Sequence, residues 1–290
     1  MRLAGHGRRM ASSRNALATV SGRVRLPAQA VGALAIVVGV VLVLADLDTA
    51  GLPFVLTGVV LLAVALVGTF LGPAVRAEPL LLAAPVDGRW EALNSPTSKV
   101  PSHGTHAYGQ AFAIDLLAAP AGVERPRFGE AGGSFLAPER FPAFGLPVLA
   151  PADGVVVRAV DRMRDHRSRS SWLAYALFFL EAIPREAVGP AGVLGNHVVL
   201  RLADGTHFVL AHLQAGSVGV RRGDRVAVGQ VLARCGNTGS TTEPHLHCQR
   251  QDVASVFLAT GLPWTVPGGL PVDGEALGPQ ADALGAPTEP

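Results

Sequence analysis

Two long uncharged apolar runs near the N-terminus constrain the fold of this chain more than any other feature. They cover residues 28–45 and 52–71, and a membrane-spanning helix needs about 20 apolar residues. Asp46 and Asp48 separate the two runs. Two buried core helices would be the soluble alternative, but neither run has the polar face of a helix at a protein surface. We therefore expect two transmembrane helices within residues 28–72.

The segment before the first run is basic. Residues 1–27 hold six arginines and no acidic residue, so we expect a basic, disordered tail. A secretory signal peptide ending near Asp48 would explain the first apolar run, but it would leave the second unexplained. By the positive-inside rule the arginines would keep the N-terminus in the cytoplasm, and two spans would return the rest of the chain to the same side.

Composition excludes several classes of function. Only 16% of the residues are charged and 49% are hydrophobic, whereas a disordered chain would be charged and poor in apolar residues. The net charge of +2 is too balanced for a general nucleic-acid binder. The two cysteines, Cys235 and Cys248, exclude a disulfide-rich scaffold and a four-cysteine zinc site, although one disulfide between them would be compatible with the sequence.

The sequence after the two apolar runs differs from them in composition and pattern. Residues 73–90 are rich in Pro, Ala and Leu and are expected to be a linker. Residues 269–290 contain acidic but no basic residues and are expected to be a disordered acidic tail. Between them, residues 91–268 consist of short β-prone runs separated by Gly, Pro and Asp turns. This spacing predicts a mostly antiparallel β domain. An apolar stretch over residues 172–183 interrupts it and predicts a capping helix or a lid, too short to span a bilayer.

The densest polar cluster lies late in the chain, where His245 and His247 flank Leu246. Alternate side chains of a strand share a face, so both imidazoles would project to one side. Such a pair can hold a metal, or one imidazole can be a ligand and the other a general base. A bare His-X-His can also be an incidental pair on a solvated edge strand.

Other residues favour a metal site. His212 ends the β-prone run 208–212, and Asp115 ends the alternating run 111–115. His103 and His106 lie in the loop before Asp115. A carboxylate with two or three imidazoles suits zinc and needs no thiolate. The remaining histidines of the domain lack such neighbours and are expected to be ordinary surface or core residues: His166, His197 and His207.

Several short motifs in this order resemble the M23 (lysostaphin or LytM type) zinc metallopeptidases. The resemblance covers roughly residues 95–250, and the motifs are Ser-His-Gly-Thr (102–105), Gln-Ala-Phe-Ala-Ile-Asp (110–115), Ala-Pro-Ala-Asp-Gly-Val (150–155), Gly-Asn-His-Val-Val (195–199), Ala-His-Leu (211–213), Gly-Asp-Arg-Val-Ala-Val-Gly-Gln (223–230), Gly-Asn-Thr-Gly (236–239) and Pro-His-Leu-His (244–247). It implies a mainly β fold: an antiparallel β-sheet metallopeptidase domain with a barrel-sandwich-type core, here preceded by two transmembrane helices.

The resemblance also implies roles for individual residues. One zinc ion per chain would be held by His103, Asp115 and His247, while His212 and His245 would be the catalytic pair. The early histidine of the compact family pattern lies four residues before the aspartate, whereas here His103 precedes Asp115 by twelve. His106, nine before it, is the alternative ligand, and the Ser-His-Gly-Thr motif favours His103.

The function implied is hydrolysis of peptide cross-links in bacterial peptidoglycan by a membrane-anchored zinc metalloendopeptidase. The domain would then face the outside of the cell membrane, against the expectation from the N-terminal arginines. A membrane-attached, non-enzymatic binding or regulatory module is the alternative, but such a module would not need the complete five-residue site. A biotinyl or lipoyl carrier is excluded because the only lysine, Lys99, lies far from the turns that would present it.

Overall fold

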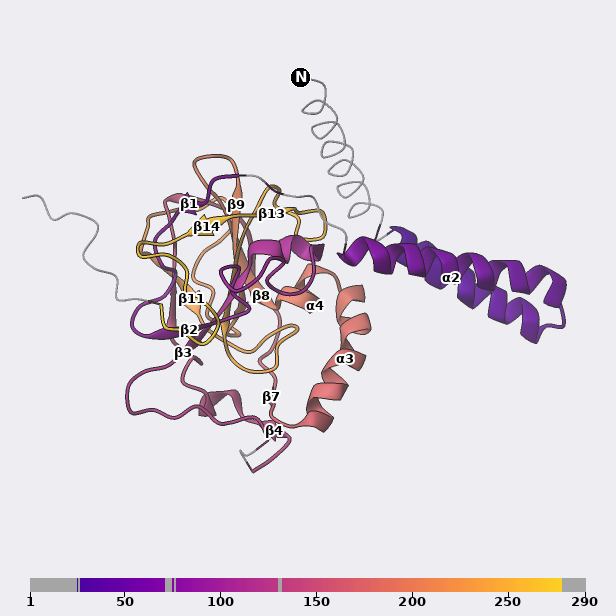
Figure 1. The fold of residues 1–290 in the computed structure, drawn as a ribbon, viewed down its shortest axis with the longest axis horizontal. Coiled ribbons are helices and arrows are strands. Elements are labelled where there is room, and N and C mark those ends of the chain that lie inside the picture. Colours follow the sequence, from indigo (N-terminus) through magenta and orange to yellow (C-terminus); the bar gives the residue numbers. More distant parts are fainter. Residues whose placement is uncertain (1–24, 26, 71–74, 76, 130–131, 278–290) are drawn as a thin grey trace, which may run out of the picture.

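The computed structural model describes residues 25, 27–70, 75, 77–129 and 132–277. Within this part of the chain a helical hairpin projects from a β domain (Figure 1). Apart from Arg25 and Pro27, the predicted basic tail over residues 1–27 lies outside the described residues, as do residues 278–290 of the predicted acidic tail.

The two apolar runs form the two helices of the hairpin, Pro27–Leu44 and α2 (Asp48–Phe70). Glycines let their backbones come close: a Cβ added at Gly39 would lie 2.8 Å from the carbonyl oxygen of Gly51, and one added at Gly58 would lie 2.6 Å from that of Gly32. Most other side chains of both helices are exposed and apolar. The hairpin is long and apolar enough to cross a membrane, and close packing through small residues is typical of membrane helices.

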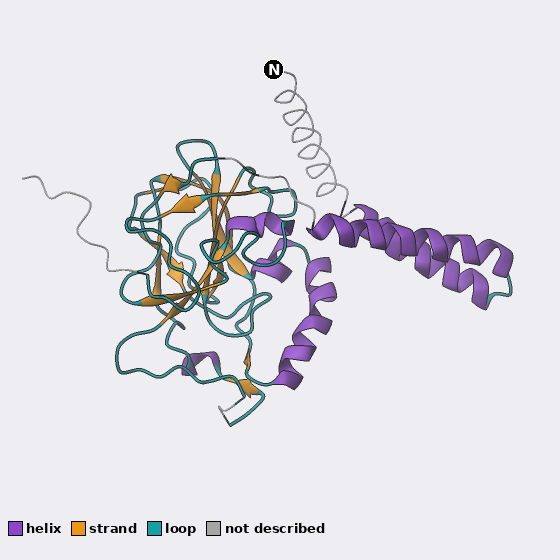
Figure 2. Cartoon of the chain, in the orientation of Figure 1, coloured by secondary structure: helices purple, strands orange, loops and turns teal. Residues whose placement is uncertain are grey.

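The rest of the described chain folds into a domain of short strands with few helices (Figure 2). Its strands are β1 (Leu80–Leu81), β2 (Trp90–Leu93), β3 (Ile114–Ala118), β4 (Phe135–Leu136), β5 (Pro147–Leu149), β6 (Gly154–Val160), β7 (Ser168–Arg169), β8 (Asn196–Arg201), β9 (His207–Leu213), β10 (Arg225–Val226), β11 (Val231–Arg234), β12 (Leu246–Gln251), β13 (Gly261–Leu262) and β14 (Trp264–Thr265). Its helices are α3 (Trp172–Ala187), α4 (Pro190–Leu194) and the short 3₁₀ helices η1 (Ala107–Phe112) and η2 (Pro138–Arg140).

The main sheet is antiparallel throughout, with strand order β10-β6-β8-β9-β12-β3-β2, and β13 also pairs with β12. Asp204 and Gly205 lie in the turn between β8 and β9, as expected of a hairpin signal. Smaller sheets pair β5 with β11 and β4 with β7 antiparallel, and β1 with β14 parallel.

The central strands β8 and β9 are buried on both faces. One face contributes to the main core. On the other face Val199, Val209 and Ala211 form a smaller cluster with Leu194 of α4 and with Val256. Because cross-strand neighbours share a face, Ala211 brings His247 of β12 to the side of this smaller cluster.

Two features differ from the sequence expectation. The domain is an antiparallel β domain, but the chain as a whole is mixed α and β, not mainly β, because the hairpin and α3 add long helical segments. The core also takes in residues from segments expected to be linker or tail. Leu82 and Val86 come from residues 73–90, and Leu277 comes from residues 269–290.

Candidate metal centre and active site

The register of the main sheet places an acid beside a histidine. Asp115 of β3 lies directly opposite His247 of β12, and both side chains are buried. The Asp115 Oδ1 atom is 2.8 Å from His247 Nδ1. On the other side of His247 the cross-strand neighbour is Ala211 of β9, whose small side chain leaves room above the sheet.

His103 reaches the same point from the loop between β2 and η1. Its Nε2 atom is 3.1 Å from Asp115 Oδ2. One ligand atom from each of His103, Asp115 and His247 lies within 4.8 Å of the others, a separation suited to a shared metal ion. His106 is not part of this group: it lies at the end of the same loop, where its backbone N–H donates to the carbonyl of Thr69 in α2.

Hydrogen bonds behind the two imidazoles fix which nitrogen faces the centre. Ser102 Oγ donates to the Gln110 carbonyl and so accepts from His103 Nδ1–H, which leaves the Nε2 lone pair facing Asp115. The Gln249 amide donates to the Tyr108 carbonyl, so its Oε1 accepts from His247 Nε2–H. The Nδ1 lone pair of His247 then also faces Asp115.

The direction of these lone pairs shows whether the three residues suit a metal ion. Two imidazole lone pairs and a carboxylate converge on one buried point, where they would repel one another unless a proton or a cation lay between them. Two nitrogen ligands and one oxygen ligand, each imidazole oriented by an outer hydrogen bond, are a donor set typical of catalytic zinc. The three residues therefore fit a zinc ion.

His212 joins the centre through an unusual backbone conformation. It follows Ala211, and neighbouring residues of a regular strand point to opposite faces, so it would normally point away from His247. Its φ angle is 62°, in the left-handed region that few residues other than glycine adopt. With this backbone its ring centre lies 4.8 Å from that of His245 and 5.8 Å from that of His247.

His245 and His212 share one tautomer, assigned from their partners. His245 Nδ1 donates to the carbonyl of Glu243 at 2.8 Å, and His212 Nδ1 donates to that of Thr238 at 2.9 Å. Each ring therefore has its basic Nε2 free to accept a proton, and His245 Nε2 is 3.6 Å from Asp115 Oδ1. Neither imidazole belongs to the group of three close ligand atoms.

The electrostatics keep the carboxylate charged and His212 neutral. Burial alone would raise the pKa of Asp115, but the charges that His103 and His245 carry when protonated, with the hydrogen bonds that protonated His103 and His247 donate, hold it well below its ordinary value. Burial lowers the pKa of His212 well below its ordinary value, and the nearby His245 and His247 add to this. Burial acts in the same direction on His247, but its hydrogen bond to Asp115 and the charge of that group raise its pKa overall.

The other histidines lie apart from the centre. His166 contacts the Gly239 carbonyl and the Arg169 guanidinium, and His207 contacts the Asp252 carbonyl. His197 is buried beside the Gly195 carbonyl, and burial lowers its pKa to about 4. The two cysteines are free and buried, and burial raises the pKa of each thiol.

Several residues that orient the centre were not singled out from the sequence. Gln249 lies two residues after His247 on the same strand, and that spacing is the signal that could have identified it. Asn94, whose amide donates to Asp115 Oδ2 at 2.9 Å, is brought in by the β2–β3 pairing and had no comparable signal. Glu243 and Thr238 act through backbone carbonyls, which carry no residue-type signal.

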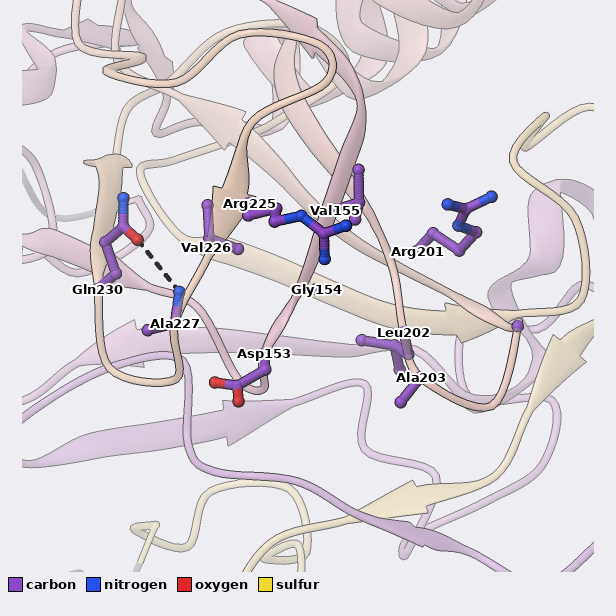
Figure 3. A pocket seen from close by; sticks show the side chains of 11 residues that line it. Asp153, Gly154, Val155, Arg201, Leu202, Ala203, Arg225, Val226, Ala227 and Gln230 are labelled. Carbon is purple, nitrogen blue, oxygen red and sulfur yellow. Dashed lines mark hydrogen bonds between the residues drawn. The ribbon is translucent and has the colours of Figure 1, made fainter.

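Two hollows in the described part of the domain lie outside the centre. A broad one of about 850 Å³ lies between the β6–β10 pair and the β8–β9 turn (Figure 3). Asp153, Arg201 and Arg225 line it, but no imidazole, thiol or hydroxyl does, so it offers no group suited to hydrolysis. A smaller pocket of about 110 Å³ adjoins the centre through Glu243, whose carbonyl orients His245.

Part of the chain is similar in sequence to known peptidases. The family model described as Peptidase family M23 matches residues 184–256, the stretch that carries His212, His245 and His247. The chain is 30% identical over 119 residues to glycyl-glycine endopeptidase ALE-1 of Staphylococcus capitis, a match that covers 41% of this chain. The chain spans only a quarter of the length of that curated relative, 25%.

Solved structures with lower similarity include lysostaphin of Staphylococcus simulans, 21% identical over 51% of this chain and 40% of that one, with a TM-score of 0.30. The separate catalytic domain of lysostaphin is 20% identical over 60% of this chain and 87% of that one, with a TM-score of 0.31. The sequence matches, not these structures, carry the family assignment. The part of the chain over residues 184–256 matches peptidase family M23.

Proposed function

We propose that this chain is a membrane-anchored zinc metalloendopeptidase that hydrolyses peptide cross-links of bacterial peptidoglycan. The observation that carries the proposal is the convergence of His103, Asp115 and His247 on one point, with the free Nε2 atoms of His212 and His245 beside it. The relative's name, a glycyl-glycine endopeptidase, supports a peptide bond as the substrate.

The chain's own residues supply the proton chemistry. Bound zinc would act as a Lewis acid toward the scissile carbonyl and would make water more acidic. His245 and His212, each with its proton on Nδ1, can accept a proton at Nε2 from the attacking water. The resulting imidazolium can stabilise the developing oxyanion and return the proton to the leaving amine. The Glu243 and Thr238 carbonyls keep both rings oriented throughout these steps.

Digestion of isolated peptidoglycan tests this function. The zinc-loaded chain should release new amino groups, and mass spectrometry of the products should place each cut at a peptide bond within a cross-link. His245→Ala, which leaves the three ligands in place, is the matched control and should release none above background. If the unchanged, zinc-loaded chain binds the wall without releasing amino groups, the non-enzymatic module is the better account.

The hairpin supports the anchoring part of the proposal. A cleaved signal peptide would not need a second apolar helix, and a core helix of a soluble protein would be mostly buried. Here Gly39 packs against Gly51 and Gly32 against Gly58, while the outer surfaces of both helices remain apolar and exposed. Such a unit matches a bilayer, where close backbone contact holds the helices together and lipid covers the rest.

We also propose that the domain faces the outside of the membrane, because peptidoglycan lies there. Both ends of the hairpin contact the domain, through Arg25 and Thr69, so the N-terminal arginines and the domain would share one side. The positive-inside rule favours the cytoplasm for that side. A reporter active only outside the cytoplasm, fused after Pro290, should be active. Activity of a cytoplasm-dependent reporter at the same position would contradict a wall substrate and leave the zinc site unaffected.

A further inference from the structure

Helix α3 presents the reverse of an ordinary surface helix. Its outward side chains are large and apolar, with Trp172 75% exposed and Leu180 72% exposed. Surface helices of soluble proteins place charged residues outward and apolar residues inward. The full set of exposed large apolar side chains on α3 is Trp172, Leu173, Leu177, Phe179 and Leu180, which we call the α3 apolar face.

The charged residues of α3 point the other way. Glu181 pairs with the buried guanidinium of Arg169 and with Arg185 of its own helix. Glu186 pairs with Arg25, the residue that begins the described part of the hairpin, at 3.2 Å. The charged side chains of α3 are therefore paired with residues of the protein, and none of them belongs to the α3 apolar face.

The position of α3 relative to the hairpin indicates what covers this face. The Arg25–Glu186 ion pair and the hydrogen bond from Tyr108 to Glu186 at 2.5 Å hold the C-terminal end of α3 at the base of the hairpin. From there α3 runs across the direction of the hairpin, on the side of the domain from which the hairpin projects (Figure 1). A membrane crossed by the hairpin would lie along α3. At 1.5 Å per residue, the 16 residues of α3 extend for about 24 Å in that plane.

We propose that α3 is an interfacial helix that rests its apolar face on the lipid bilayer crossed by the hairpin. This inference depends on the anchoring proposed above. Such helices bury their apolar side roughly 5–10 Å into the boundary between headgroups and acyl chains, and tryptophan is a favoured residue there. The domain would then be held by lipid at two places, the hairpin and α3. Because Arg185 also donates to the Gly239 carbonyl, α3 would fix the orientation of the loop beside His212 and His166.

Tryptophan fluorescence in the full chain tests the proposal, because Trp172 is exposed whereas Trp90 and Trp264 are 1% and 4% exposed. The chain is reconstituted in phosphatidylcholine vesicles with bromine atoms at defined depths in the acyl chains. Shallow bromines should quench the emission of Trp172 strongly and deep ones less. Acrylamide should quench the emission of Trp172 several-fold less in this chain than in the double variant Leu173→Glu/Leu180→Glu described below. Trp172→Phe should abolish the bromine effect.

Charged substitutions supply a matched pair. The double variant Leu173→Glu/Leu180→Glu should stay in the membrane but lose the bromine quenching of Trp172 and regain acrylamide access. Val231→Glu changes another exposed apolar residue, 56% exposed on β11 and away from the hairpin, and should behave like the unchanged chain. Neither variant alters a buried side chain, so loss of folding would not imitate the expected result.

Each other outcome overturns the proposal in a distinguishable way. If the chain resists an alkaline wash of the vesicles while Trp172 stays open to acrylamide, anchoring stands and the interfacial role of α3 fails. If Trp172 is shielded from both quenchers and the chains cross-link as pairs, the α3 apolar face is a contact between two copies. If the alkaline wash removes the chain, anchoring fails, and the role of α3 fails with it.

Discussion

Replacing His247 by alanine should remove bound zinc and peptidase activity together. The variant loses one of three ligands and leaves the Asp115 carboxylate buried without its partner at 2.8 Å. Loss of an outer partner of a ligand typically costs about 10–100-fold in metal affinity, and loss of the ligand itself should cost more. Metal analysis after dialysis against a weak chelator, together with release of amino groups from peptidoglycan, measures both effects.

The early ligand has a control in its own loop. His103→Ala should lose zinc as His247→Ala does, because His103 Nε2 faces Asp115 at 3.1 Å. His106→Ala should keep zinc, because His106 lies outside the group of close ligand atoms. The opposite result in a zinc titration would move the early ligand to His106 and leave Asp115 and His247 in place.

Replacing His245 by alanine should leave zinc bound and abolish most of the activity. Its Nε2 atom is assigned to proton transfer, and a positioned general acid or base contributes about 10²–10⁴-fold, or roughly 3–5 kcal/mol of the barrier. His212→Ala should act in the same way. The rate constant for cleavage and the zinc content are measured on the same preparation, so that the two roles are separated.

Two results would contradict this division of roles. If His245→Ala and His247→Ala lose zinc equally while both remain folded, His245 is a ligand and not a proton carrier. If the double variant His212→Ala/His245→Ala retains more than a few per cent of the activity, proton transfer belongs to another group. Circular dichroism of each variant checks that the fold is retained.

Residue spacing anticipated part of the local geometry, while the roles of the residues stay predictions. His247 lies on β12, His245 immediately precedes that strand, and Asp115 lies on β3 opposite His247. The order of the two apolar runs likewise predicted two helices. These features depend on neighbours in the chain, and a residue spacing carries that information.

Features that depend on distant contacts were harder to predict. No local rule predicts the φ of 62° at His212, whose Nδ1 donates to the carbonyl of the distant Thr238. The pairing of β2 with β3, which delivers Asn94 to Asp115, joins segments that are separated in the chain by the loop and the short helix η1. For the same reason, the sequence did not show that Val86 and Leu277 belong to the core.

Helix α3 illustrates how a pattern can be seen and still be incompletely interpreted. Its apolar composition predicted a capping helix or a lid, and the structure contains a helix there. Which side faces outward depends on Arg169 and Arg25, the partners of Glu181 and Glu186, and these come from other parts of the chain. The outward direction of Trp172 and Leu180 therefore follows only from the folded structure.

X-ray absorption at the zinc edge tests the central claim most directly. The account predicts that the purified chain binds one zinc ion whose nearest neighbours are only nitrogen and oxygen, at about 2.0–2.2 Å, with the outer-shell scattering of two imidazole rings. His247→Ala should lose one of these rings or the metal itself. A sulfur neighbour at about 2.3 Å would contradict the account, because it would place zinc at Cys235 or Cys248 and not between His103, Asp115 and His247.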